Sequence, residues 1–198
     1  MNNTRKNTLI ILDWDDTIFP SSWLKKNMTK FNTDNVNFKE LDKIILKLSN
    51  VLNDLGYVVI ITNANLEWIE FSGQFIPQSY EFMSNKFEII SARTKYEMVG
   101  SDMFLWKKLA FMDVFQNLES KTNIQNIISV GDAEYEFKAT LDLVAKFKLS
   151  KKFFKTIRLQ TTPHIEIIMD ELDVLTDDFD RIVNEKRNLD LLFECSSK

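Results

Sequence analysis

Five short apolar runs, separated by segments with helical periodicity, constrain the fold of this chain more than any other feature of its sequence. The runs occupy residues 9–14, 57–62, 87–92, 127–131 and 154–159. Each run is short enough to form a buried β-strand, and strands that alternate with helices are typical of β-α-β units. The sequence therefore predicts an α/β fold in which a mainly parallel, five-stranded sheet is covered by helices on both faces.

The intervening helices are predicted from apolar residues that recur every three or four positions. The clearest pattern covers residues 38–55, with Asn37 as a candidate cap at its start and Gly56 as a candidate end. Further patterns cover residues 66–75, 104–118 and 134–147.

The last part of the chain is predicted to be a helical extension over about 162–192. Thr162-Pro163 is a typical helix start, and residues 176–178 are a candidate restart into a second helix. With this extension, residues 1–198 are expected to form a single domain.

Composition excludes several classes of functional site. The chain has one cysteine, one histidine and four well-separated glycines. A disulfide framework, a His/Cys zinc site, a Ser-His-Asp triad on a G-x-S-x-G turn and a glycine-rich phosphate loop therefore lack their residues. The net charge of −4 gives no indication of a nucleic-acid-binding surface. Any chemistry is expected to use carboxylates, lysine, hydroxyl groups and a metal ion.

The predicted location is cytoplasmic or nuclear. No stretch of the sequence is long and apolar enough to predict a membrane span, and the apolar run at residues 9–12 is too short for the core of a signal peptide. We therefore expect no membrane partner, and the sequence gives no oligomeric state.

Polar side chains follow three of the five predicted strands, and a fourth set lies on the helix after the third strand. The sets are Asp13, Asp15 and Thr17; Thr62 and Asn63; Asp132 and Glu136; and Lys107 and Lys108. Ligands of open parallel sheets bind at the carboxyl ends of the strands, so these side chains are expected to share one edge. Clustered carboxylates suit Mg²⁺, two acids in distinct environments can divide the roles of nucleophile and general acid, and a lysine can hold a phosphoryl oxygen. Together they suit phosphoryl transfer to a carboxylate.

In this order, the residues resemble the four motifs of the haloacid dehalogenase (HAD) superfamily. Asp13-Trp14-Asp15-Asp16-Thr17 resembles the first motif, D-x-D-x-T, and Thr62 is similar to the second. Lys107 or Lys108 matches the third. Gly131-Asp132-x-x-x-Glu136 resembles the fourth, usually G-D-x-x-x-D, with Glu136 in place of the second aspartate. The resemblance covers roughly residues 9–162.

The resemblance implies a three-layer Rossmann-like fold and Mg²⁺-dependent phosphoryl transfer through an aspartyl-phosphate. It implies that Asp13 is the nucleophile and a metal ligand, that Asp15 is the general acid/base and binds the metal through its backbone carbonyl, and that Asp132 binds the metal. It implies that Thr62, with Asn63 beside it, binds the phosphoryl group, and that the catalytic lysine of the third motif, Lys107 or Lys108, stabilises the nucleophile and the phosphoryl group. Lys107 is slightly favoured because it follows Trp106 and precedes an apolar pair at 110–111. Glu136 and Thr17 are expected near the metal site without binding the ion directly.

The spacing of the motifs leaves no room for a full cap domain. The gap at residues 18–56 mostly contains the helix over 38–55, which leaves a small flap over about 18–37, and the gap at 64–106 is largely used by a helix and a strand. Members of the family without caps often act on bulky substrates, such as phosphoproteins or nucleic-acid ends. We therefore predict a Mg²⁺-dependent phosphomonoester hydrolase for a bulky or macromolecular phosphorylated substrate, with a protein among the candidates.

Two other functions stay open. The first is a HAD-like module that binds phosphate or a partner without effective turnover. The second is a nucleic-acid end phosphatase, which would need a local basic patch near Lys25, Lys26 and Lys30 because the overall charge does not support it.

Overall fold

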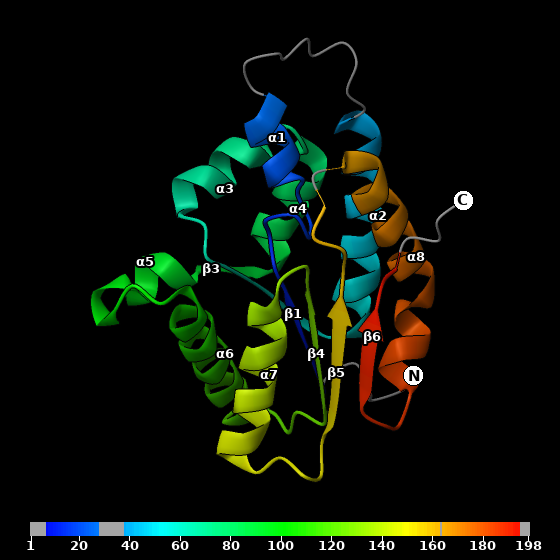
Figure 1. Ribbon diagram of the computed structural model, residues 1–198. Helices are drawn as coiled ribbons and strands as arrows, with labels where there is room; N and C mark the ends of the chain where they lie inside the picture. The colour runs from blue at the N-terminus through cyan, green and yellow to red at the C-terminus, as the bar shows by residue number, and fades with distance from the viewer. Residues whose placement is uncertain (1–6, 28–37, 163, 195–198) are drawn as a thin grey trace.

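One parallel sheet with helices on both faces forms the framework of the protein. The computed structural model describes residues 7–27, 38–162 and 164–194. Its six strands lie in the order β3-β2-β1-β4-β5-β6, and every neighbouring pair is parallel. The strands are β1 (Thr8–Leu12), β2 (Tyr57–Thr62), β3 (Glu88–Ser91), β4 (Asn126–Gly131), β5 (Phe153–Arg158) and β6 (Leu189–Leu192). This arrangement confirms the predicted α/β, Rossmann-like fold (Figure 1).

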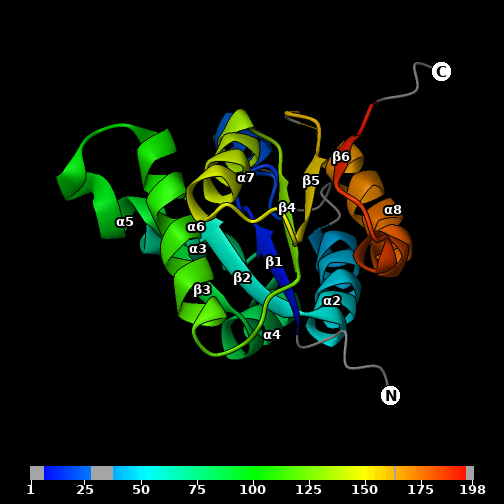
Figure 2. The same cartoon turned by 90° about the horizontal axis from the view of Figure 1, so that it is seen from below.

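Alternating side chains of the strands pack against two separate helix layers. In β1, Ile10 and Leu12 join the core beneath α2 (Phe38–Leu55) and α8 (Ile165–Asn184), together with α3 (Leu66–Gly73) and α4 (Pro77–Lys86). Leu9 and Ile11 join the core beneath α6 (Met103–Glu119) and α7 (Glu134–Phe147). Figure 2 shows the sheet between these two layers. Burial on both faces explains why the strands read as continuous apolar runs.

The sheet has one strand more than predicted. β6 lies within residues 162–192, which the sequence indicated as a helical extension, so that prediction is wrong at its end. β6 has four residues, pairs with β5 at the edge of the sheet, and alternates half-buried with exposed side chains. A strand this short carries too few apolar positions to give a clear periodic pattern.

The predicted break in the C-terminal helix is also wrong. α8 runs without interruption from Ile165 to Asn184. Thr176, at the predicted restart, donates a hydrogen bond from its side chain to the carbonyl of Leu172 one turn earlier (2.6 Å), so it continues the helix.

Most helix boundaries agree with the periodic patterns. α2 and α7 have their predicted bounds, and the amide of Gly56 donates to Leu52 O (3.1 Å) where α2 ends. Pro77 begins a separate helix, α4, because proline fits the first helical position. The proposed cap Asn37 and the proposed start residue Pro163 lie outside the described residues.

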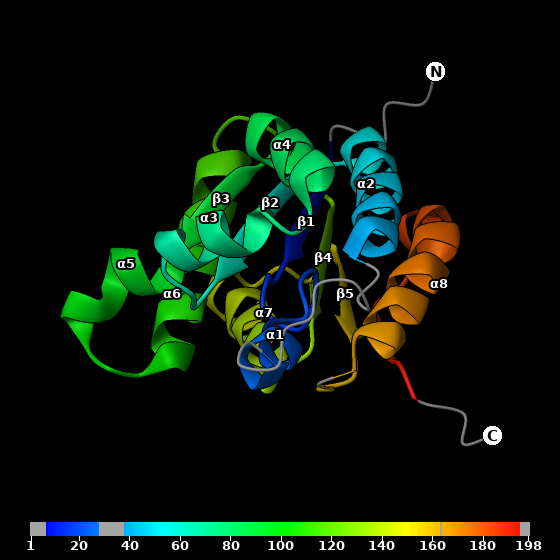
Figure 3. The ribbon, with the colours of Figure 1, turned by 90° about the horizontal axis from the view of Figure 1, so that it is seen from above.

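The carboxyl ends of all strands meet at the edge of the sheet that faces the viewer in Figure 3. The short helix α1 (Ser21–Asn27) lies at this edge and forms most of the described part of the predicted flap, residues 18–27. The α5 (Ala92–Tyr96) and η4 (Glu97–Val99) segments follow β3 and lead into α6. No helix in the described part of the chain is both long and apolar enough to cross a membrane.

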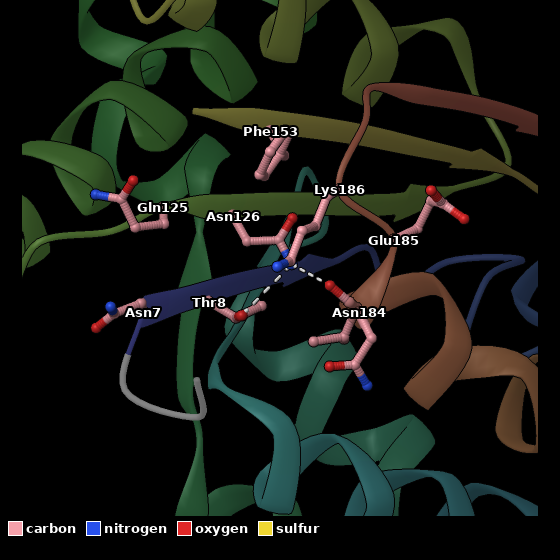
Figure 4. Close-up of a pocket in the computed structure, with 9 residues that line it drawn as sticks. Asn7, Thr8, Gln125, Asn126, Phe153, Asn184, Glu185 and Lys186 are labelled. Atoms are coloured by element: carbon pink, nitrogen blue, oxygen red, sulfur yellow. Dashed lines mark hydrogen bonds between the residues drawn. The ribbon is translucent and has the colours of Figure 1, made fainter. Parts of the chain in front are cut away.

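The opposite, amino-terminal edge of the sheet is tied to the end of α8. The carbonyl of Val183 accepts hydrogen bonds from Asn126 Nδ2 (3.0 Å) and Lys155 Nζ (2.9 Å), and Asn126 also lies 3.5 Å from Thr8 Oγ1. Asn126 lines a pocket of about 190 Å³ at this edge (Figure 4). Burial lowers the pKa of the Lys155 amine from 10.5 to about 8, although the negative charge of Glu185 acts to raise it.

Replacement of Lys155 by methionine is expected to change how stability depends on pH. The folded pKa of about 8 lies below the unfolded value of 10.5, so between these values the unfolded chain binds more protons and the wild type gains stability as pH rises. Lys155→Met lacks this gain. Urea unfolding of both proteins from pH 7 to about pH 10 should show the wild type gaining relative to the variant above about pH 8. A pH-independent difference would contradict the buried amine.

Candidate active site

The chain reverses direction immediately after β1. The amide of Asp13 still donates to Val130 O on β4 (3.0 Å). Asp16 then adopts a left-handed backbone conformation (φ 53°), which aspartate tolerates better than most residues, and its amide donates to Phe19 O (2.7 Å). Trp14 is fully buried, and its indole N–H donates to Ser72 Oγ (3.0 Å). This fixed turn holds Asp13 and Asp15 at the carboxyl end of the central strand.

A buried ion cluster joins Asp13 to two helices. Nζ of Lys107, on α6, lies 2.5 Å from Asp13 Oδ1 and 2.6 Å from Oε1 of Glu136, on α7. The exposed fractions of the three residues are 7% for Asp13, 1% for Lys107 and 3% for Glu136. Water therefore screens these contacts little, and each charge depends on its partners.

Burial and charge act together on the pKa values of this cluster. Burial raises the pKa of Asp13 well above its ordinary value; Lys107 opposes that rise, and the charge of Glu136 adds to it. For Lys107, burial lowers the pKa, but the adjacent carboxylates of Asp13 and Glu136 outweigh burial and raise it above its ordinary value. Lys107 therefore stays protonated at neutral pH.

The two candidate lysines of the third motif point in different directions. Lys107 faces Asp13, as described above. Lys108 forms an ion pair with Asp142 of α7 (2.6 Å), and about a third of its side chain is exposed. The structure thus brings Lys107, and not Lys108, to the end of β1.

Glu136 fits this corner because residue 131 is a glycine. A Cβ atom at Gly131 would lie 2.5 Å from Cγ and 2.6 Å from Oε2 of Glu136, closer than real Cβ contacts allow. Among the described residues, Oε2 of Glu136 has no hydrogen-bond partner although it is buried. The negative charge of Glu136 also raises the pKa of the neighbouring Asp132.

Asp132 lies at the carboxyl end of β4 beside Thr17. Its backbone amide donates to Thr17 Oγ1 (3.1 Å), which lies 3.5 Å from Asp132 Oδ1. Burial, followed by the charges of Glu136 and Asp16, raises the pKa of Asp132 to about 7. Thr17 thus contacts Asp132, and its place beside a metal ion stays a prediction.

Thr62 and Asn63 follow β2, the other neighbour of β1. The fully buried Thr62 hydroxyl accepts from the Ala64 amide (2.9 Å) and lies 3.3 Å from Asp15 Oδ2. The side-chain amide of Asn63 donates instead to Met103 O at the start of α6 (3.2 Å). Thr62 is therefore next to Asp15, whereas a phosphate contact of Asn63 stays a prediction.

The carboxyl groups at this edge are oxygen donors of the type that Mg²⁺ prefers. Among the described residues, no three His, Cys, Asp or Glu side chains are grouped to hold a metal ion. Mg²⁺ needs fewer, because it commonly binds one or two carboxylates and keeps water or phosphate in its other positions. Asp13, Glu136 and Asp132 place three carboxyl groups near the one ammonium of Lys107, and burial is the largest cause of the raised pKa values of Asp13 and Asp132. A cation bound there would lower both pKa values.

Two residues that the sequence analysis missed contact Asp15. Trp68 Nε1 on α3 lies 2.8 Å from Asp15 Oδ1, and the Ser21 hydroxyl on α1 donates to the same oxygen. A serine after Pro20 indicates a helix start, but no local pattern indicates a contact between positions 53 residues apart, as Asp15 and Trp68 are.

A groove of about 770 Å³ begins at Asp132 and crosses the carboxyl ends of β4, β5 and β6. Its lining includes Tyr135 and Phe193 as well as two cations. The cations are paired: Arg158 lies 2.8 Å from Asp190, and Lys138 lies 3.4 Å from Glu134. The groove is therefore mixed in character and lacks a run of free positive charge.

Comparison of the chain with protein-family models, with curated proteins and with solved structures gives no match.

Removal of the Lys107 ammonium is expected to destabilise the fold strongly. Lys107→Met leaves two buried carboxylates without their cation, and breaking a buried ion pair in this way typically costs about 3–5 kcal/mol. Lys108→Met is the matched control, and loss of its partly exposed ion pair should cost about 0–1 kcal/mol. The free energy of unfolding in urea measures both. Equal losses would contradict the buried cluster.

Proposed function

We propose that this protein is a Mg²⁺-dependent phosphomonoester hydrolase of the HAD type that acts through an aspartyl-phosphate. The observation that supports this most directly is the contact between Asp13, at the carboxyl end of the central strand, and the fully buried ammonium of Lys107 (2.5 Å). A carboxylate held at a strand end by a permanent buried cation can attack a phosphoryl group and have its charge balanced throughout.

The side chains around Asp13 divide the remaining roles. Asp13 attacks phosphorus while Lys107 stabilises the negative charge. Thr62 binds a phosphoryl oxygen through its hydroxyl. Asp15 donates a proton to the leaving oxygen and then takes one from the water that hydrolyses the intermediate. Mg²⁺, held by Asp13, Asp132 and the Asp15 carbonyl, would supply positive charge that orients and polarises the phosphoryl group.

The groove beside Asp132 supports a bulky substrate. At about 770 Å³ it offers space next to the site for more than a phosphoryl group. The described flap adds only α1, so no large domain covers this edge in the described residues. The paired state of Arg158 and Lys138 gives no support for a nucleic-acid end, and the predicted patch near Lys25 and Lys26 includes Lys30, which lies outside the described residues.

The first test is hydrolysis of a generic aryl phosphate with Mg²⁺, with EDTA, and by Asp13→Asn. The wild type should turn over only with Mg²⁺, and Asp13→Asn should lose all detectable activity because an amide cannot form the aspartyl-phosphate. Asp13→Asn with full Mg²⁺-dependent turnover would refute the proposal.

Beryllofluoride, which mimics an aspartyl-phosphate, separates a hydrolase from a module that only binds. Mg²⁺-dependent beryllofluoride binding by the wild type and not by Asp13→Asn would show a competent nucleophile. Absence of both binding and turnover would favour the binding module.

Mg²⁺ is expected to raise the melting temperature through Asp132. A ligand at about 100 times its Kd stabilises the folded state by about 2.7 kcal/mol, which corresponds to about 5–10 °C for a chain of this size. Asp132→Asn should lose most of this shift, whereas Asp173→Asn, an exposed carboxylate on α8 that pairs with Lys47, should keep it. Equal shifts in all three proteins would place the metal elsewhere.

A further inference from the structure

The carboxylate of Asp15 has one saturated oxygen and one that faces the proposed site. Oδ1 accepts hydrogen bonds from Trp68 Nε1 (2.8 Å) and from the Ser21 hydroxyl. Oδ2 lies 3.3 Å from Thr62 Oγ1 on the neighbouring strand β2. Because Oδ1 already has two donors, Oδ2 is the oxygen available for proton exchange.

The two donors to Oδ1 are themselves fixed in place. Trp68 lies in the first turn of α3, where its backbone amide donates to the capping side chain of Asn65 (3.0 Å). Its indole N–H also lies 3.2 Å from Ser21 Oγ. Ser21 is 1% exposed, and Lys25, one turn later on α1, places its ammonium 4.7 Å from the centre of the Trp68 ring. Helices α1 and α3 therefore hold the Asp15 carboxylate together.

We propose that Trp68 and Ser21 are positioning residues that fix the orientation of Asp15, so that Oδ2 carries the proton in both steps of the reaction. The inference rests on the proposed function. In the first step, Asp13 forms a bond to phosphorus, the bond from phosphorus to the leaving oxygen breaks, and the proton on Asp15 Oδ2 passes to that oxygen. In the second, water bonds to phosphorus, the bond from phosphorus to Asp13 breaks, and the proton of the water passes to Asp15 Oδ2.

If Trp68 and Ser21 orient the general acid, their loss should affect substrates that need leaving-group protonation more than substrates that do not. A general disturbance of the site should affect both kinds of substrate equally. Phenol is a poor leaving group that needs protonation, whereas p-nitrophenol leaves readily without it. The ratio kcat/KM reports on formation of the aspartyl-phosphate, the step in which the leaving group departs. A misoriented acid should therefore impair cleavage of phenyl phosphate far more than cleavage of p-nitrophenyl phosphate.

The experiment compares Trp68→Phe with the wild type on these two substrates in Mg²⁺. Trp68→Phe keeps an aromatic ring and loses the N–H donor, so kcat/KM for phenyl phosphate should fall about tenfold or more, and that for p-nitrophenyl phosphate less than about threefold. Ser21→Ala should show the same selectivity, and Ser21→Thr, which keeps the hydroxyl, should restore phenyl phosphate cleavage. Trp106→Phe is the matched control, because its indole N–H donates to Gly100 O (2.6 Å), away from Asp15.

The outcomes separate the two proposals. Equal losses on both substrates, or no loss, would overturn the positioning role while leaving the proposed hydrolase intact. A wild type that neither cleaves these substrates nor binds beryllofluoride with Mg²⁺ would overturn both, since no proton transfer would then remain for Asp15 to perform. The hydrogen bond itself has an independent readout: the indole N–H resonance of Trp68 should shift in Asp15→Asn, and an unchanged resonance would contradict the contact.

Discussion

The buried ammonium of Lys107 is the interaction on which the arrangement of this edge depends. It lies between Asp13 and Glu136, so one charge ties α6 to the end of β1 and to the first turn of α7. A buried charge is costly unless its partners stay in contact, so none of the three elements can shift without exposing an unpaired ion. The charge that the proposed phosphoryl transfer would need is therefore also the charge that holds these helices in place.

The residues of the proposed site rest on two kinds of support. Asp13, Thr62 and Asp132 follow three adjacent strands of the sheet, so hydrogen bonding between strands sets their spacing. Asp15 depends instead on side chains from α1 and α3, which lie outside the sheet. The proposed nucleophile and metal ligands are thus placed by the hydrogen-bonded sheet, and the proposed proton donor by helices outside it. A site that must bind and release a bulky molecule can use this division, because helices can move where a central strand cannot.

Strands that are buried on both faces could be predicted from the sequence, because they appear as unbroken apolar runs. β6 could not be predicted in this way, because its four residues at the sheet edge carry no comparable pattern. For the candidate site, the strand ends predicted side chains that share one edge, since parallel strands finish together, and their roles stay predictions. Adjacent Lys107 and Lys108 could not be separated, because which one turns inward depends on how α6 packs. The contacts of Asp15 with Ser21 and Trp68 likewise arise only when distant segments meet.

Glycine at 131 and glutamate at 136 form a matched pair. The glutamate methylene and carboxylate occupy the volume that any side chain at 131 would need. An aspartate at 136, being one methylene shorter, would relax this restriction but would draw its carboxylate back from the Lys107 ammonium. Residues 131 and 136 are therefore expected to vary together among related proteins. A larger residue at 131 would destabilise this protein unless residue 136 also changed.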